Sequence, residues 1–257
     1  MANLTIEFFS NSLNRPVTFK MLIPNDPIGK DTTKTTPMKV IFLLHGYTGA
    51  AGNWIPEEYA TKHNFAIVMP SGENAFYVDG LSTGHAYGTF VAVELVDYIR
   101  KTFGLALRAE DTFIMGMSMG GFGAIKSALM YPDRFSRIIA LSPAYIIHKI
   151  ANMEPNTFDG MANYDYYHEC FGDLSKVEES RNNPEVLIDE LIAKGTDIPK
   201  LYMAIGTEDF LLEPVRAFEE FLKSRGVNHV YEESTGGHDM EFWARYARSF
   251  VPLLFEE

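Results

Sequence analysis

The chain has 257 residues, of which 46% are hydrophobic and 22% are charged, and its formal net charge at pH 7 is −12. This length and composition predict a single globular domain over residues 1–257 and exclude a disordered chain or a repeat array. The acidic balance disfavours nucleic acid and anionic membrane surfaces as partners, because both are bound through clustered Lys and Arg side chains.

The cysteine content and the length of the apolar runs indicate where in the cell the protein is expected. Cys170 is the one cysteine, which excludes an internal disulfide framework and a cysteine-based zinc site. No apolar run approaches the roughly 20 residues that span a bilayer. Residues 1–7 lack the basic and apolar segments of a signal peptide. We therefore expect a cytoplasmic protein without a transmembrane segment.

Strand and helix patterns alternate along most of the chain. Residues 4–9 and 17–24 are β-rich runs around a polar turn, which predicts an antiparallel pair, and a polar loop follows over residues 25–37. Short, almost continuous apolar runs then indicate strands that are buried on both faces of a mostly parallel sheet. These runs cover residues 40–44, 65–69, 112–117, 138–141, 201–205 and 229–232.

Helical spacing of apolar residues occurs between the predicted strands. It is found at residues 87–103, 120–130, 214–224 and 241–254. Strands that alternate with helices predict a three-layer α/β sandwich. The long stretch between residues 141 and 200 breaks the alternation and is rich in Tyr, Asn and Phe in its first half. A connection of this length is unusual unless it carries its own structure, so we predict an inserted cap or lid over residues 143–199.

A candidate nucleophile lies between a predicted strand and a predicted helix. Residues 116–120 read Gly-Met-Ser-Met-Gly and match the G-x-S-x-G nucleophile elbow. The match alone is weak, since about one chain of this length in ten contains it by chance. Its position after a buried strand and before a Gly-rich helix strengthens it, because Ser118 must occupy a tight turn that leaves no room for side chains at the flanking positions.

A serine hydroxyl needs a general base, and a third group must orient that base. Of the seven histidines, His238 lies in a Gly-rich loop after the last predicted strand and before the last helix. The fold order places the carboxylate between the serine and the histidine. Asp209, directly after the strand at 201–205, is the preferred candidate, and Glu208 and Glu213 are its rivals.

The oxyanion of an acyl-transfer intermediate needs two preorganised N–H donors. The backbone N–H of Met119, which follows the serine, is the first candidate. The loop after the strand at 40–44 should supply the second, and Tyr47 is the preferred residue there. His45 in the same loop is expected to orient the backbone.

These segments together resemble the esterase D-like branch of the α/β-hydrolases, which includes tributyrin esterases and feruloyl and acetyl-xylan esterases. The resemblance rests on residues 43–46, 74–79, 116–124, 206–211 and 237–243. It implies an α/β-hydrolase fold and a carboxylesterase that works through an acyl-enzyme without a metal or another cofactor. It also implies that Ser118, Asp209 and His238 form the triad and that Tyr47 and Met119 supply the oxyanion donors.

Three alternatives to the esterase hypothesis stay open. S-formylglutathione hydrolases are relatives, but their pattern includes a cysteine shortly after the oxyanion segment, and residues 48–51 contain none. An acyltransferase would use the same triad with an acceptor other than water. A catalytically inactive binding module is disfavoured, because all three triad candidates are present.

The expected substrate is a small ester with a short acyl or hydroxycinnamoyl group, such as those released from plant polysaccharide. A hydroxycinnamoyl ring would pack against aromatic side chains near the serine. Each candidate aromatic residue could equally pack the inserted segment against the rest of the domain. The candidates are Trp54, Phe76, Tyr77 and Tyr145, with Tyr164, Tyr166 and Tyr167 in the inserted segment.

Overall fold

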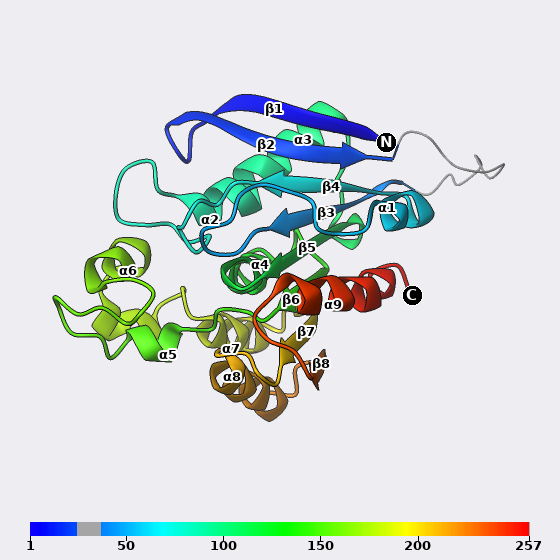
Figure 1. The fold of residues 1–257 in the computed structure, drawn as a ribbon. Helices are drawn as coiled ribbons and strands as arrows, with labels where there is room; N and C mark the ends of the chain where they lie inside the picture. Colours follow the sequence, from blue (N-terminus) through cyan, green and yellow to red (C-terminus); the bar gives the residue numbers. More distant parts are fainter. Residues whose placement is uncertain (25–36, 257) are drawn as a thin grey trace.

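One mixed sheet organises the chain in a computed structural model that describes residues 1–24 and 37–256 (Figure 1). The polar loop predicted over residues 25–37 therefore lies outside the described residues except for Pro37. The strands of the described part follow the order β1-β2-β4-β3-β5-β6-β7-β8. They are β1 Ala2–Ser10, β2 Arg15–Ile23, β3 Lys39–Leu44, β4 Phe65–Pro70, β5 Thr112–Met117, β6 Arg137–Leu141, β7 Lys200–Gly206 and β8 His229–Ser234.

Strand directions agree with the sequence pattern. β2 runs antiparallel to β1 and to β4, which confirms the predicted opening pair. All later neighbours, from β4 through β3 to β8, are parallel. Parallel strands point their carboxyl ends to one edge of the sheet, so the loops after β3, β5, β7 and β8 are gathered there.

The two faces of the sheet are covered by different helices. In β3, Val40, Phe42 and Leu44 join the core beneath the helices α3 (Leu95–Phe103), α4 (Met119–Met130), α7 (Pro184–Lys194) and α8 (Leu212–Ser224). The alternate residues Ile41 and Leu43 join the core beneath α1 (Glu57–His63) and α9 (Met240–Leu253). Because successive strand residues face opposite sides, burial of both faces requires an unbroken apolar run. This arrangement confirms the predicted three-layer sandwich.

Helix bounds differ from the predicted ranges by one or two residues for three of the four predicted helices. The fourth, predicted over 87–103, is one helical run in which a π-helical turn, η1, separates α2 from α3. The helical elements outside the inserted segment are α1 Glu57–His63, α2 Tyr87–Thr89, η1 Phe90–Glu94, α3 Leu95–Phe103, η2 Ala109–Asp111, α4 Met119–Met130, α8 Leu212–Ser224 and α9 Met240–Leu253.

The segment predicted as a cap contains short helices. They are α5 Ile147–Ile150, α6 Tyr164–Phe171, the 3₁₀ helix η3 Leu174–Glu179 and α7 Pro184–Lys194. Asn163, Asp173 and Asn183 cap α6, η3 and α7 with their side chains, which accounts for the polar composition of the segment. In Figure 1, α5 and α6 lie at the left of the view, away from the C-terminus. A cap function of residues 143–199 stays a prediction.

None of the helices in the described ranges is long and apolar enough to cross a membrane.

Candidate active site

Ser118 sits in a strained turn between β5 and α4. Its backbone has φ 52° and ψ −121°, a conformation that is rare for residues other than glycine. A Cβ at Gly116 would lie 2.1 Å from the carbonyl oxygen of Gly120, and a Cβ at Gly120 would lie 2.4 Å from the carbonyl oxygen of Leu44. Both flanking glycines are therefore required by close backbone contact, as the sequence motif predicts.

A chain of hydrogen bonds joins the three residues that the sequence singled out. His238 Nε2 lies 2.9 Å from Ser118 Oγ, and His238 Nδ1 lies 2.8 Å from Asp209 Oδ2. The ring of His238 packs against Phe210, at 4.6 Å between ring centroids, and in a T-shaped arrangement against Trp243, at 4.9 Å. Residues 120 positions apart in the chain thus come within hydrogen-bond distance, at the carboxyl edge of the sheet.

Asp209 is buried and ionised. Burial by itself would raise the pKa of its carboxyl group, but the hydrogen bond from His238 and the Leu211 N–H, at 2.9 Å from Oδ1, hold the pKa below its ordinary value. The Ser142 hydroxyl adds a further hydrogen bond to the carboxylate. A buried carboxylate that stays ionised can stabilise a proton on the neighbouring imidazole.

His45 fixes the loop after β3. Its Nδ1 lies 2.8 Å from the carbonyl oxygen of Gly46, and its Nε2 accepts the N–H of Gly72 at 2.9 Å. Since Nε2 is an acceptor, the neutral ring carries its proton on Nδ1 and donates it to Gly46. Burial lowers the pKa of His45, which keeps the ring neutral. A trans peptide points its C=O and N–H in opposite directions, so the Tyr47 N–H points away from His45.

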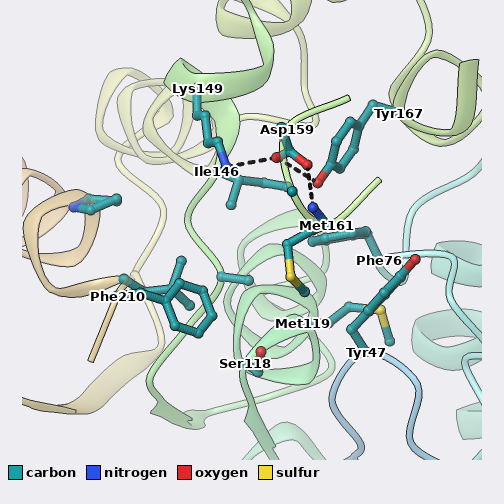
Figure 2. A pocket seen from close by; sticks show the side chains of 14 residues that line it. Tyr47, Phe76, Ser118, Met119, Ile146, Lys149, Asp159, Met161, Tyr167 and Phe210 are labelled. Carbon is teal, nitrogen blue, oxygen red and sulfur yellow. Dashed lines mark hydrogen bonds and ion pairs between the residues drawn. The ribbon is translucent and has the colours of Figure 1, made fainter. Parts of the chain in front are cut away.

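Two backbone N–H groups lie free beside the serine. A Cβ at Gly46 would lie 3.4 Å from Ser118 Cβ, so the loop that carries Tyr47 runs along the nucleophile elbow. Among the described residues, neither Tyr47 N–H nor Met119 N–H has a hydrogen-bond acceptor. Figure 2 shows Tyr47, Met119 and Ser118 at the same end of a pocket. The arrangement can therefore offer two donors to an oxyanion formed at Ser118.

Comparison with known proteins decides the family. A family model described as "Putative esterase" matches residues 10–250. The chain is 39% identical over 253 residues to an acetyl esterase of Caldicellulosiruptor saccharolyticus, an alignment that covers 96% of this chain and 95% of the relative. The chain belongs to the esterase family.

Two solved structures from Staphylococcus aureus resemble this esterase along nearly its whole length, each at 26% identity. One is a substrate-bound, fluorophosphonate-binding serine hydrolase, with a TM-score of 0.85 and coverage of 100% of this chain and 99% of that chain. The other is an S-formylglutathione hydrolase, with a TM-score of 0.82 and coverage of 99% of both chains. The predicted α/β-hydrolase fold is confirmed, and this esterase is a carboxylesterase of the serine hydrolase type.

The pocket of the esterase has a volume of about 350 Å³ and ends at Ser118. Its walls are mostly apolar and come from the loops after the strands, from α4 and α8, and from the inserted segment (Figure 2). Besides Ser118, Met119, Ala144, Gly160 and Pro214, the lining residues are Tyr47, Phe76, Ile146, Lys149, Asp159, Met161, Tyr167, Phe210 and Leu211.

Some of the aromatic candidates line the pocket, and the others pack against the core. Phe76 and Tyr167 line the pocket, and Tyr166 packs behind Phe76 at 6.4 Å between ring centroids. Tyr164 lies outside the lining and packs, partly buried, against the main core. Trp54 also lies outside the lining and packs in the core beneath α1 and α9.

Tyr77 and Tyr145 are not brought to the pocket either. Tyr77 is fully buried and donates its hydroxyl to the carbonyl oxygen of His45 at 3.0 Å. Tyr145 donates to Asn183 at 2.8 Å and stacks on Phe218 at 4.5 Å. Both tyrosines thus stabilise the elements around the site, because their rings and hydroxyls already have partners in the core.

Several lining residues of the esterase were absent from the sequence prediction. Phe210 directly follows Asp209 in the sequence, so its position next to a predicted triad residue could have indicated that it lines the pocket. Lys149, Asp159 and Met161 lie in the inserted segment, where the sequence shows no clear periodicity. Within residues 1–24 and 37–256, no group of three or more His, Cys, Asp or Glu side chains could hold a metal ion.

Proposed function

We propose that the esterase hydrolyses short-chain acyl esters, with Ser118 as nucleophile, His238 as general base and acid, and Asp209 as the carboxylate that orients His238. The observation that carries this proposal is the continuous hydrogen-bond chain from Asp209 through His238 to Ser118 at the end of an apolar pocket. This constellation is recognised by geometry and recurs on unrelated hydrolase folds.

In the acylation step, His238 Nε2 takes the proton from Ser118 Oγ while this oxygen bonds to the carbonyl carbon of the ester. The carbonyl electron pair moves onto its oxygen, and the N–H groups of Tyr47 and Met119 donate to the resulting oxyanion. Loss of one such donor typically costs about 3 kcal/mol of transition-state stabilisation. The carbon–oxygen bond to the alcohol then breaks, and the His238 imidazolium protonates the leaving alcohol.

Deacylation repeats the sequence with water. His238 removes a proton from water, and the hydroxide oxygen bonds to the acyl carbon on Ser118. The intermediate expels Ser118 Oγ, which recovers its proton from His238, and the carboxylic acid leaves. Asp209 stays ionised in both steps and stabilises the imidazolium, consistent with its lowered pKa.

The acyl group of the substrate is inferred from the relatives and from the pocket lining. The relative at 39% identity is an acetyl esterase, which supports an acetyl or other short acyl group. The rings of Tyr47, Phe76 and Tyr167 in the lining support a hydroxycinnamoyl group as well. We therefore include esters of both kinds, among them those carried by plant polysaccharide.

A thioester is the second candidate substrate. The likeness to the S-formylglutathione hydrolase of Staphylococcus aureus supports it, and the same triad chemistry would cleave a carbon–sulfur bond. An acyltransferase differs only in the acceptor that replaces water. Added alcohols therefore separate transfer from hydrolysis by their ester products.

The test is turnover of a panel by the purified protein. The panel comprises p-nitrophenyl acetate and butyrate, methyl ferulate, acetylated xylo-oligosaccharides and S-formylglutathione. We expect cleavage of the short acyl esters, and Ser118→Ala should lower kcat by at least about 10⁴-fold while the melting temperature is kept. Ser127→Ala is the control, because Ser127 lies on α4, the helix that follows Ser118, and its buried Oγ has no hydrogen-bond partner among the described residues. A panel left intact, or wild-type rates in Ser118→Ala, would overturn the proposal.

A further inference from the structure

Asp159 is the centre of a polar cluster in the wall of the pocket. Its Oδ2 lies 2.7 Å from Lys149 Nζ on α5 and accepts the Tyr167 hydroxyl of α6 at 3.2 Å. Its Oδ1 accepts the N–H groups of Met161 and Ala162, each at 2.9 Å. One carboxylate therefore joins the turn at residues 159–162 to two helices (Figure 2).

The cluster is charged and largely shielded from water. The Asp159 side chain is 8% exposed, although the Lys149 side chain is 53% exposed. Burial would raise the pKa of Asp159, but Lys149 and the two N–H groups lower it to about 2. The carboxylate is therefore ionised throughout the range in which His238 can act as a base, and charge-assisted hydrogen bonds of this kind hold geometry well.

Met161 projects from this cluster toward the serine. In Figure 2 its side chain extends from the Asp159 turn into the pocket, in the direction of Ser118. The residue is 50% exposed although it lines the pocket, so its thioether covers open pocket space and is not packed in the core. Gly160, beside it, has φ +95°, a conformation that holds the turn and that other residues adopt with strain.

The acyl group belongs on this side of Ser118. In the proposed reaction His238 protonates the leaving alcohol, so the alcohol lies beside His238. The acyl group stays on Ser118 and must occupy the space away from His238. Phe210, whose ring packs on His238, lines one side of the pocket, and Met161 and the Asp159 cluster line another part of it that has no contact with His238.

We propose that Asp159 and Met161 determine acyl-chain specificity: the Asp159 cluster, with Lys149 and Tyr167, fixes Met161 as the end wall of the acyl pocket. This inference rests on the proposed function. Short acyl groups fit between Ser118 and the wall, and longer straight alkyl chains collide with Met161. A planar hydroxycinnamoyl group would instead pack against the aromatic rings of Tyr47 and Phe76 in the same lining. Asp159 acts through Met161 and is thus a positioning residue.

The test is the ratio of kcat/KM for p-nitrophenyl octanoate to that for p-nitrophenyl acetate. Met161→Ala should raise this ratio at least about fourfold, the value of one methylene group moved from water into an apolar site. Asp159→Asn keeps an acceptor for the N–H groups but loses the ion pair with Lys149, so the ratio should rise there too. A purely structural role would lower both rates equally and leave the ratio unchanged.

Two controls match these variants. Ile192→Ala removes an exposed apolar side chain of the same inserted segment, and Asp173→Asn removes a carboxylate that also accepts an N–H and pairs with a lysine. Neither residue lines the pocket, and both should keep the wild-type ratio. If Asp159→Asn fails to fold, Met161→Ala still tests the specificity proposal. The Met161 side chain is half exposed, so its removal should leave the fold intact.

The outcomes separate the two proposals. If the wild type cleaves acetate and Met161→Ala keeps the wild-type ratio, the specificity proposal is wrong and the proposed function stands. If the wild type cleaves none of the esters, the proposed function itself fails.

Discussion

Trp243 supports the site through two contacts of one side chain. Its Nε1 donates to the buried Ser142 hydroxyl at 3.1 Å, and its ring packs at 87° to the ring of His238. An indole N–H is a donor only, so Ser142 accepts this bond and keeps its own proton for Asp209. Trp243 thus contacts His238 directly and Asp209 through Ser142.

We expect Trp243→Phe to lower the free energy of unfolding by about 1–3 kcal/mol, because the Ser142 oxygen loses its buried donor. Urea denaturation measures this loss. The other tryptophan, Trp54, is the matched control, since its Nε1 has no partner among the described residues and Trp54→Phe removes no hydrogen bond. Equal losses in the two variants would contradict the role given to the Trp243 N–H.

Residue-level prediction from sequence succeeded where close backbone contacts restrict the choice of residue. The tight turn at Ser118 demands glycine at 116 and 120, and this requirement is visible in the sequence. The positions of aromatic side chains were less predictable. Tyr77 and Tyr145 can lie in the core because their hydroxyl groups donate hydrogen bonds to residues distant in the chain. The sequence does not reveal these partners.

At the scale of elements, α5 is tied to the rest of the inserted segment by His148. Its Nδ1 lies 2.5 Å from Glu178 on η3, and its Nε2 lies 3.2 Å from Glu185 on α7. Burial would lower the pKa of His148, but the two carboxylates raise it above its ordinary value of 6.5. Because α5 also carries Lys149, the His148 contacts help to hold a lining residue of the pocket in place.

The His148 contact should make stability depend on pH. A raised folded-state pKa means that the contribution is complete below pH 6.5 and is lost as the pH rises through the folded-state value. We expect His148→Gln to lower the melting temperature by at most about 3 °C at pH 5.5, since exposed ion pairs are weak. The difference from wild type should shrink by pH 9. A difference that grows with pH would contradict the assignment.

The inserted segment shows the limit of pattern reading at this scale. Three of its helices, α5, α6 and η3, have eight residues or fewer, so apolar periodicity has few turns in which to appear there. The strands β3 and β5 were predicted because burial of both faces gives a continuous apolar run, and α9 was predicted because its buried residues recur at helical spacing. The turn at Asp159 depends on its contacts with Lys149 of α5 and Tyr167 of α6, which the sequence order does not reveal.

At the scale of the whole molecule, the parallel sheet brings the loops after β3, β5, β7 and β8 to one edge. Ser118, Asp209 and His238 lie at this edge, which is why chain order and motif context selected three residues that the structure brings together. The pocket is different, since its far wall comes from the inserted segment and not from the sheet. Sequence alone therefore predicts the reaction better than it predicts the ester.

The central claim is that Ser118 is the nucleophile and that His238 activates it. Fluorophosphonate labelling followed by peptide mass spectrometry tests this claim most directly, because the probe bonds covalently to an activated serine oxygen. We expect a single adduct on Ser118 that disappears in Ser118→Ala and forms much more slowly in His238→Ala. An adduct on another residue, or an unchanged labelling rate in His238→Ala, would contradict it.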